Sequence, residues 1–358
     1  MGRYARYGGG KNFMTSNILV TGGAGYIGSH TCRALAAAGY TPVVLDNLSS
    51  GHRWAVKWGP LVVADIADHA RVSQTIKEYG IQAVIHFAAH AYVGESVQQP
   101  RKYFNNNVTK TLALLDTLLE AGITKLVFSS SCATYGIPQE LPITEDHPQQ
   151  PINPYGASKL FVEKILHWYE RAYGMRYMIL RYFNAAGADP DGEIGEEHTP
   201  ETHLVPLVIA AALGVNPAVE IFGTDYDTAD GTAVRDYVHV CDLATAHIKA
   251  LDRLLAGGAS ASVNLGTGRG QSIRDVISAV EAVSHRLVPV IEGRRRSGDP
   301  PALIADPQLG QSLLGWRPLK SDMHTIVRTA WEWHQTRLLE LTQGCAPEKE
   351  MLKSELEC

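Results

Sequence analysis

The sequence predicts an α/β protein with a Rossmann-type, doubly wound parallel sheet and a smaller, interleaved α/β lobe. Two observations predict this class. Short apolar or β-branched runs alternate with helical segments in the first half of the chain, and the first run leads into a glycine-rich turn. Strands that are apolar throughout and separated by helices are typical of a parallel sheet covered on both faces.

The apolar periodicity predicts the individual elements. Six runs are interpreted as strands: Asn17–Thr21, Pro42–Leu45, Leu61–Ala64, Ala83–Phe87, Lys125–Ser129 and Arg176–Arg181. Eight segments are interpreted as helices: Tyr26–Ala38, Ala70–Tyr79, Tyr103–Ala121, Pro154–Tyr173, Leu204–Leu213, Leu243–Leu255, Ile273–Val283 and Thr325–Arg337.

These elements suggest four parts of the chain. Residues 1–13 are Gly- and Arg-rich without apolar periodicity, and we expect a leader that joins no core. Residues 14–185 form the first domain, to which about 234–265 return. After about residue 185 the chain has more Gly, Pro and acidic residues and shorter elements, so we expect residues 186–337 to form the second lobe. The last segment, 338–358, has little apolar pattern and is expected to be a frayed tail.

The composition excludes several functional classes. The 358 residues carry a formal charge of −5, which argues against a general nucleic-acid binder. The richest apolar stretch, Leu204–Val215, contains Pro206 and is too short to span a bilayer. Five cysteines without a CxxC pair indicate reduced thiols and a cytoplasmic location. His86 and His90 form an HxxxH, but they follow a strand-like run, so we expect loop histidines and no metal.

The glycine-rich turn predicts a dinucleotide site. Gly22, Gly25 and Gly28 lie between the first strand and the first helix. Missing side chains let the backbone approach a pyrophosphate at the N-terminus of that helix. Asp46 ends the next strand, where a carboxylate accepts hydrogen bonds from ribose hydroxyls and repels a 2′-phosphate. This combination favours NAD over NADP.

Later strand ends could complete the cofactor site. Asp65 and Ile66 follow the third strand and could flank the adenine. Phe87, Ala88 and Ala89 follow the fourth, where small residues would let a dinucleotide cross the sheet edge.

A tyrosine and a lysine predict acid–base chemistry at the same edge. Tyr155 and Lys159 are four residues apart at the start of a predicted helix, so they share one face. An ammonium and a nicotinamide cation beside a phenol would favour the phenolate. Such a phenol can exchange a proton with a sugar hydroxyl while a hydride moves. The serines that follow the fifth strand, 129–131, could hold the substrate oxygen in line.

Four blocks make the sequence resemble a known family: Thr21–His30, Val93–Val97, Arg181–Asn184 and Val234–Val240. They resemble the extended short-chain dehydrogenase/reductases, and within them the UDP-glucose 4-epimerases. The similarity runs from about residue 17 to 337. It implies that NAD and a UDP-sugar bind, and that UDP-glucose and UDP-galactose are interconverted through a transient 4-keto sugar. It also implies a homodimer in which the helices Tyr103–Ala121 and Pro154–Tyr173 pair with their copies, although their apolar positions could equally cover the sheet.

The resemblance also implies roles for individual residues. Tyr155 would be the acid/base, Lys159 its activator and Ser131 the hydroxyl that orients the substrate. NAD would be held by Gly22, Gly25, Tyr26, Ile27, Gly28, Asp46, Asn47, Asp65, Ile66, Phe87, Ala88, Ala89, Asn106, Ser129, Tyr155, Lys159 and Tyr182. The UDP-sugar would be held by Ser131, Tyr155, Asn184, Leu204, Arg235, Arg296 and Asp299. Of the run Arg294–Arg296, we expect at least two to be solvated.

Two positions depart from the family pattern, and alternatives stay open. Ala91 stands where many relatives carry a cofactor-binding lysine. Leu303 stands where sugar size is limited in relatives, which leaves open an epimerase that also accepts N-acetylated sugars. The stretch Ser130–Tyr135 resembles members that act on UDP-pentoses, so a UDP-pentose epimerase is a second alternative. A 4,6-dehydratase would need acids where Cys132 and Ala133 stand. A non-catalytic dinucleotide sensor would not need Tyr155 and Lys159 together.

Overall fold

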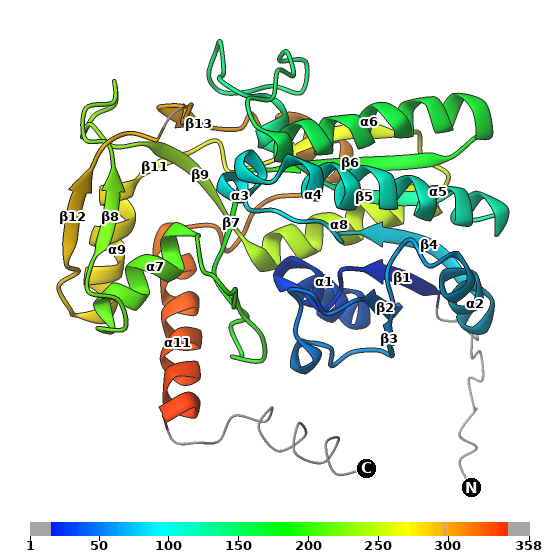
Figure 1. Ribbon diagram of the computed structural model, residues 1–358, viewed down its shortest axis with the longest axis horizontal. Helices are drawn as coiled ribbons and strands as arrows, with labels where there is room; N and C mark the ends of the chain where they lie inside the picture. The colour runs from blue at the N-terminus through cyan, green and yellow to red at the C-terminus, as the bar shows by residue number, and fades with distance from the viewer. Residues whose placement is uncertain (1–15, 297, 343–358) are drawn as a thin grey trace, which may run out of the picture.

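The larger sheet of the computed structural model has seven parallel strands in the order β10-β6-β5-β4-β1-β2-β3 (Figure 1). The structure describes residues 16–296 and 298–342. The strands of this sheet are β1 (Asn17–Thr21), β2 (Thr41–Asp46), β3 (Leu61–Val63), β4 (Ile81–His86), β5 (Lys125–Ser131), β6 (Arg176–Tyr182) and β10 (Ala261–Leu265).

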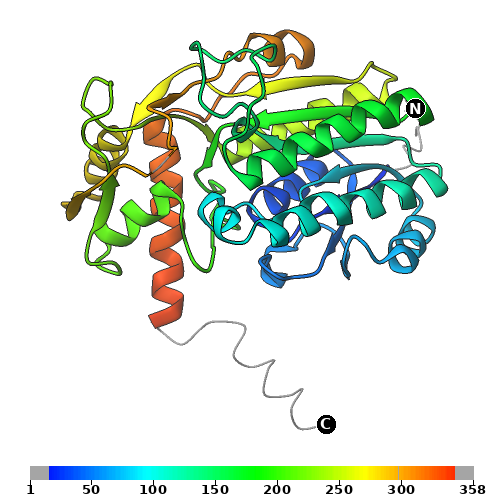
Figure 2. The ribbon, with the colours of Figure 1, turned by 45° about the horizontal axis from the view of Figure 1, so that its top comes forward.

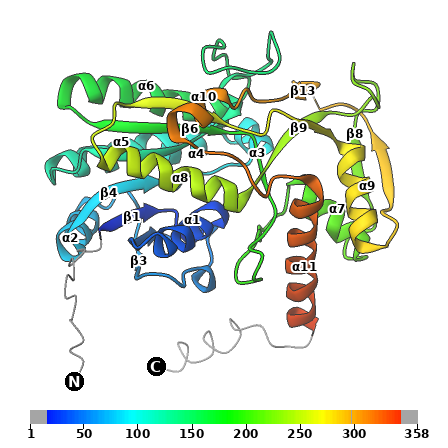
Figure 3. The same ribbon diagram turned by 180° about the vertical axis from the view of Figure 1, so that it is seen from behind.

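Helices cover both faces of this sheet, as β1 illustrates. Its Ile18 and Val20 pack with α1 (Tyr26–Ala37) and α8 (Val240–Leu255), which lie in front of the sheet in Figure 3. The intervening Leu19 packs in the opposite core, because successive strand side chains point to opposite faces. That second core is covered by α2 (His69–Tyr79), α5 (Lys110–Glu120) and α6 (Pro154–Tyr173). Figure 2 shows α5 and α6 in front.

The smaller lobe is built on two small sheets. Three strands pair with β9 (Val234–His239): antiparallel β11 (Gly270–Ser272) and parallel β13 (Ala302–Leu303) and β7 (Asn184–Ala186). The other sheet pairs β8 (Val219–Phe222) with β12 (Val290–Gly293). The helices of this lobe are α7 (Leu204–Ala212), α9 (Ile273–Ser284) and α11 (Met323–Thr342). They pack with β8 and β9 in a separate apolar core.

The remaining elements are short. They are the helices α3 (Val93–Gln98), α4 (Pro100–Phe104) and α10 (Gln308–Leu314), the 3₁₀ turns Arg53–Ala55 and Cys132–Thr134, and the π-helical turn Asn105–Thr109. Among the described residues, no helix is both long enough and apolar enough to cross a bilayer.

The predicted fold class is confirmed, and one predicted helix is wrong in detail. The segment Tyr103–Ala121 is not one regular helix, because a π-helical turn separates α4 from α5. The side chain of Asn107 in this turn bonds both backbone groups of His90 at 2.9 Å and the Ser158 hydroxyl at 3.1 Å. Such tertiary hydrogen bonds widen the helix locally, as often happens at functional sites.

The segment expected to return to the first domain divides between the sheets. α8 and β10 belong to the larger sheet and its cover, whereas β9 lies in the smaller lobe. α11 continues to Thr342, five residues into the segment expected to be a tail. The predicted leader and the rest of that tail lie outside the described residues.

A buried ion pair joins α6 to the sheet. Arg181 on β6 reaches Glu163 on α6 at 2.7 Å, and both side chains are less than a tenth exposed. Glu163 also accepts a bond from the Ser130 hydroxyl at 2.5 Å, and Arg181 donates to Tyr135 at 2.9 Å. Removal of one partner from such a buried pair leaves an uncompensated charge in the interior.

We therefore expect Glu163→Ala to lower the free energy of unfolding by about 3–5 kcal/mol, measured by urea denaturation. The matched control is Glu332→Ala, which breaks the exposed pair with Arg328 on α11. That change should cost less than about 1 kcal/mol. Equal losses in both variants would contradict this account of the buried pair.

Candidate active site

The glycine turn lets α1 lie very close to the end of β1, and the turn itself packs closely against the segment after β4. A Cβ on Gly28 would lie 2.2 Å from the Gly22 carbonyl oxygen, and one on Gly22 would lie 2.6 Å from the Ala88 nitrogen. Neither position can therefore carry a side chain without a backbone shift. Gly25 is the N-cap of α1 and has no capping side chain. The first N–H groups of α1 are thus available to an anion such as a pyrophosphate.

Asp46 lies beside this turn at the end of β2. Its carboxylate accepts hydrogen bonds from the backbone N–H groups of Ala24 at 3.0 Å and Leu48 at 2.8 Å. Burial raises the pKa of Asp46, and these two bonds oppose that rise. The carboxylate therefore braces the glycine turn, and its remaining lone pairs can accept ribose hydroxyls.

The next predicted cofactor residues lie at neighbouring strand ends. Asp65 accepts bonds from Asn47 at 3.3 Å and from Lys110 at 2.5 Å. Partial burial raises the pKa of Asp65, but Lys110, the Ala67 N–H and Asn47 together outweigh it, so the pKa falls below the usual value. Phe87 and Ala88 continue β4, and their N–H groups both bond the Thr21 carbonyl.

The π-helical turn carries another predicted cofactor residue. Asn106 lies in this turn, where its side chain donates to Asn107 at 3.1 Å. Asn107 in turn fixes the backbone of the loop after β4 through His90. Sequence reasoning missed Asn107, because its contacts join segments that are distant in the chain.

Tyr155 and Lys159 occupy the first turns of α6, which begins at Pro154 with Asn153 as its N-cap. The Lys159 ammonium donates to the Ser129 carbonyl oxygen at 2.8 Å and lies 5.9 Å from the centre of the Tyr155 ring. The Ser129 hydroxyl bonds the Tyr182 hydroxyl. The structure thus brings these predicted residues together at the carboxyl ends of β5 and β6.

The charge states of this pair are governed by burial. Burial raises the pKa of Tyr155 to about 12, and a hydrogen bond with the Ser131 hydroxyl opposes that rise. Burial lowers the pKa of Lys159 to about 7, while Glu163 opposes the fall. Of the two positive charges that are predicted to favour the phenolate, the chain itself supplies only that of Lys159. The surrounding residues alone therefore keep Tyr155 protonated.

Predicted substrate residues meet on the smaller lobe. Arg235 on β9 forms an ion pair with Asp299. Leu303 on β13 is in register with Arg235 and packs against the apolar cluster that contains Cys132 and Phe183. Because Cys132 directly follows Ser131, Leu303 lies near the end of β5. This position suits a residue that limits the size of a bound sugar.

Three other predicted substrate residues are more dispersed. Asn184 lies on β7, paired with β9. Leu204 begins α7 and packs on the core of the smaller lobe. The Arg296 guanidinium lies 3.8 Å from the centre of the Phe222 ring. Arg294, Arg295 and Arg296 are all exposed, which agrees with the expectation that at least two are solvated.

Asp236 is a structural residue that sequence reasoning did not single out. Its carboxylate accepts bonds from Thr267, Gly268 and Ala305 at 2.6–3.2 Å. These bonds hold the loop after β10 and the segment after β13 against β9. Asp236 therefore holds in place the strand that carries Arg235.

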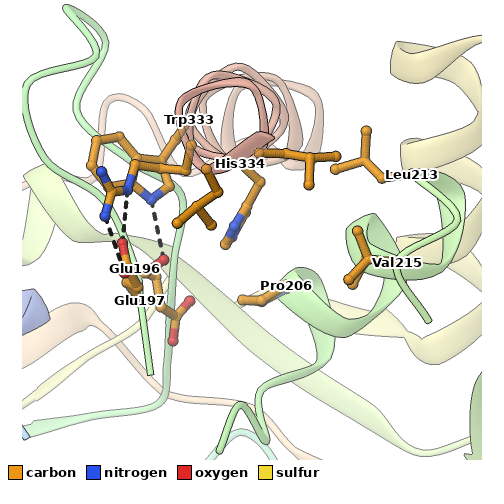
Figure 4. A pocket seen from close by; sticks show the side chains of 11 residues that line it. Glu196, Glu197, Pro206, Leu213, Val215, Trp333 and His334 are labelled. Carbon is orange, nitrogen blue, oxygen red and sulfur yellow. Dashed lines mark hydrogen bonds and ion pairs between the residues drawn. The ribbon is translucent and has the colours of Figure 1, made fainter. Parts of the chain in front are cut away.

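Of the two histidines expected in a loop, His86 is instead the last residue of β4. His86 is buried between Thr21 at 2.6 Å and Thr111 at 3.0 Å, so both ring nitrogens have hydroxyl partners. Burial lowers its pKa to about 3, so the ring is neutral. A surface pocket of about 190 Å³ lies elsewhere, between α7 and α11 (Figure 4), and no predicted site residue lines it.

Comparisons with known proteins decide the family. The sequence profile described as the NAD dependent epimerase/dehydratase family matches residues 18–266. The chain belongs to that family. It is 52% identical to the UDP-glucose 4-epimerase of Rhizobium meliloti (strain 1021), over 90% of this chain and 98% of the relative. The resemblance seen in the sequence is confirmed.

Solved structures agree. The UDP-glucose 4-epimerase from Brucella ovis in complex with NAD has 54% identity and a TM-score of 0.87, over 89% of this chain and 98% of its own. The Bifidobacterium longum UDP-glucose 4-epimerase in complex with NAD+ and UDP has 37% identity and a TM-score of 0.85, over 90% and 98%. The glycine turn and Asp46 fit the NAD that is bound in these relatives.

We expect Gly28→Ala to abolish the copurification of NAD, because its Cβ would force the Gly22 carbonyl out of the turn. The nucleotide released from denatured protein measures this loss. Gly94→Ala is the matched control, since a Cβ there meets nothing within 4 Å. If the Gly28 variant kept a full complement of NAD, the cofactor would not lie against this turn.

Proposed function

We propose that this chain is an NAD-dependent UDP-glucose 4-epimerase that interconverts UDP-glucose and UDP-galactose through a 4-keto sugar. The observation that carries the proposal is the placement of Tyr155 and Lys159 beside Ser131, at the same sheet edge as the glycine turn. Half-identical relatives named UDP-glucose 4-epimerase support it.

The roles follow from the positions of these side chains. Bound NAD supplies a hydride acceptor and donor at the sheet edge. With the positive charges of protonated Lys159 and of bound NAD beside it, Tyr155 would ionise, take the proton of the sugar 4-hydroxyl and later return it. Ser131 would hold the sugar oxygen, because its hydroxyl lies at the end of β5 beside Tyr155. Lys159 is fixed by the Ser129 carbonyl and contributes positive charge next to the phenol when protonated.

Inversion at a sugar carbon also requires that the sugar turn over while the nucleotide stays bound. The smaller lobe would grip UDP through Arg235, Asn184, Leu204, Arg296 and Asp299, and the larger lobe would hold NAD. Arg235 suits a diphosphate, because a guanidinium forms bidentate bonds with phosphate oxygens. A grip confined to the nucleotide leaves the 4-keto sugar free to present its other face.

Dehydration is not supported by the groups that follow Ser131. Cys132 is buried, and burial raises the pKa of its thiol to about 12. Ala133 has no ionisable group. Neither residue can protonate a leaving hydroxyl at neutral pH, whereas elimination of water requires such an acid. The epimerase is therefore the better supported member of the family.

Leu303 leaves room for two related substrates. Its side chain is smaller than a tyrosine and packs on the cluster next to Ser131. Turnover of N-acetylated UDP-hexoses and of UDP-pentoses at this site is compatible with that size. A panel of UDP-galactose, UDP-N-acetylgalactosamine and UDP-arabinose ranks the three by kcat/KM, and we propose that UDP-galactose ranks first.

The test of the reaction is Tyr155→Phe, which removes only the hydroxyl. We expect kcat for conversion of UDP-galactose to UDP-glucose to fall by about 10²–10⁴, with UDP binding unchanged. Tyr40→Phe is the control, because the Tyr40 hydroxyl bonds exposed Asp252 far from the sheet edge. Full activity in the Tyr155 variant would reject this residue as the base, and absence of any epimerisation by the parent protein would reject the function.

We also propose that the protein is a cytoplasmic homodimer. Phe161 and Trp168 are seven residues apart, so they lie on one side of α6, where they leave large apolar surfaces exposed, with Trp168 64% exposed. A second copy of this face would cover them. Sedimentation should show a species of twice the chain mass, and Trp168→Asp should shift it to a monomer. A monomer at micromolar concentration in the parent protein would refute the dimer.

The cysteine thiols in the described part are free, as a reducing compartment favours.

A further inference from the structure

Four side chains with metal-binding groups converge between β7 and α7, away from Tyr155 and Lys159. They are Glu196, His198, Glu201 and His203, and one ligand atom of each lies within 4.8 Å of all the others. Sequence reasoning did not identify this group, and the proposed epimerisation makes no use of it. Two imidazoles and two carboxylates form a set that transition metals commonly bind.

The distances within this His–Glu cluster match a small coordination polyhedron. His203 Nδ1 lies 3.0 Å from Glu196 and 2.9 Å from Glu201. His198 Nδ1 lies 3.4 Å from each of the same two carboxylates. A tetrahedral Zn²⁺ with ligands at about 2.0–2.1 Å has ligand–ligand separations of about 3.3 Å. The four groups therefore need little movement to close around one ion.

One ligand atom in the cluster is buried without a hydrogen bond. His198 Nδ1 makes no well-formed hydrogen bond, because the two carboxylates that face it lie 3.4 Å away. The Glu196 side chain beside it is only 4% exposed. A buried polar atom with only such long contacts is incompletely satisfied, and a coordinated ion would bind it directly.

The surroundings hold these ligands in place. Trp333 on α11 donates to the Glu196 carbonyl oxygen at 3.2 Å, as Figure 4 shows. The Glu201 carboxylate accepts bonds from the backbone N–H groups of Thr202 and His203. The Tyr26 ring, from the first turn of α1, lies edge-on to the His198 ring at 6.3 Å. The cluster thus lies where the smaller lobe meets the start of α1.

We propose that one Zn²⁺-type transition-metal ion is bound by Glu196, His198, Glu201 and His203. The ion would fasten residues 196–203 against the start of α1 in the larger lobe. All four ligands come from the protein, as in structural zinc sites, so no coordination position is left for a substrate. Two carboxylates balance the charge of a divalent ion held by two neutral imidazoles.

Protons compete with a metal ion for the two histidines of this cluster. Without a metal, the carboxylates raise the pKa of His198 to about 9 and of His203 to about 10, despite the opposing effect of burial. The same four groups would then form two neutralised ion pairs. Metal binding must displace these protons, so metal content and not contact geometry distinguishes the two states.

The experiment uses the full chain, dialysed against a chelator and then against Zn²⁺. We expect one equivalent of Zn²⁺ per chain by elemental analysis, and a Tm about 3–5 °C higher with the metal. Co²⁺ in its place should show the visible bands of a four-coordinate ion. His198→Gln and the double variant His198→Gln/His203→Gln should each lose that equivalent and the Tm response.

The matched control is His69→Gln, which breaks an exposed histidine–glutamate pair with Glu120 at 3.5 Å. This variant should keep both the metal and the Tm response. Circular dichroism confirms that each variant is folded, and His203→Gln alone serves if the double variant is not. Equal metal content in the parent and the folded cluster variants would place the ion elsewhere, for example on cysteine thiols. No bound Zn²⁺ in the parent would establish the ion-pair state and overturn the proposal.

Discussion

The rest of the site depends on how closely α1 approaches the end of β1, and on how closely the glycine turn between them approaches the segment after β4. That approach is possible because Gly22 and Gly28 have no Cβ atoms, which would lie 2.2–2.6 Å from backbone atoms. The N-terminus of α1 therefore lies directly over the carboxyl edge of the sheet. An anion bound there is within reach of Asp46 on one side and of the strand ends β4 and β5 on the other. The parallel sheet gathers these groups without any long connecting loop.

The same face of α6 carries both chemistry and stability. Tyr155, Lys159 and Glu163 follow one another at intervals of four residues, so they form a stripe along the helix. The first two reach the sheet edge, and the third forms the buried pair with Arg181. The buried Glu163–Arg181 pair thus fixes α6 to the sheet, and α6 in turn positions the phenol of Tyr155. Burial, which makes the ionised forms of Tyr155 and Lys159 costly, also keeps their geometry fixed.

The sequence was sufficient for six of the seven strands of the larger sheet, because they are continuously apolar and the glycine turn is local. It was not sufficient for the seventh, β10, or for the strands of the smaller lobe, of which β7, β11 and β13 have only two or three residues each. Such strands exist only through partners distant in the chain. The π-helical turn at Asn107 and the hydrogen bonds of Asp236 were not predicted for the same reason. The spacing of four residues after Lys159 could have identified Glu163. The alternation of glutamates and histidines from 196 to 203 is visible in the sequence, but the sequence does not show that their side chains converge.

The chain crosses the smaller lobe before it completes the larger one. The last strand of the large sheet, β10, pairs with β6, although almost eighty residues separate the two. The helix α8 that precedes it supplies much of the cover over α1. A growing polypeptide therefore cannot close its first core during synthesis until more than 260 residues have emerged. The two lobes are consequently inseparable as folding units, and neither can be exchanged by recombination at a single junction.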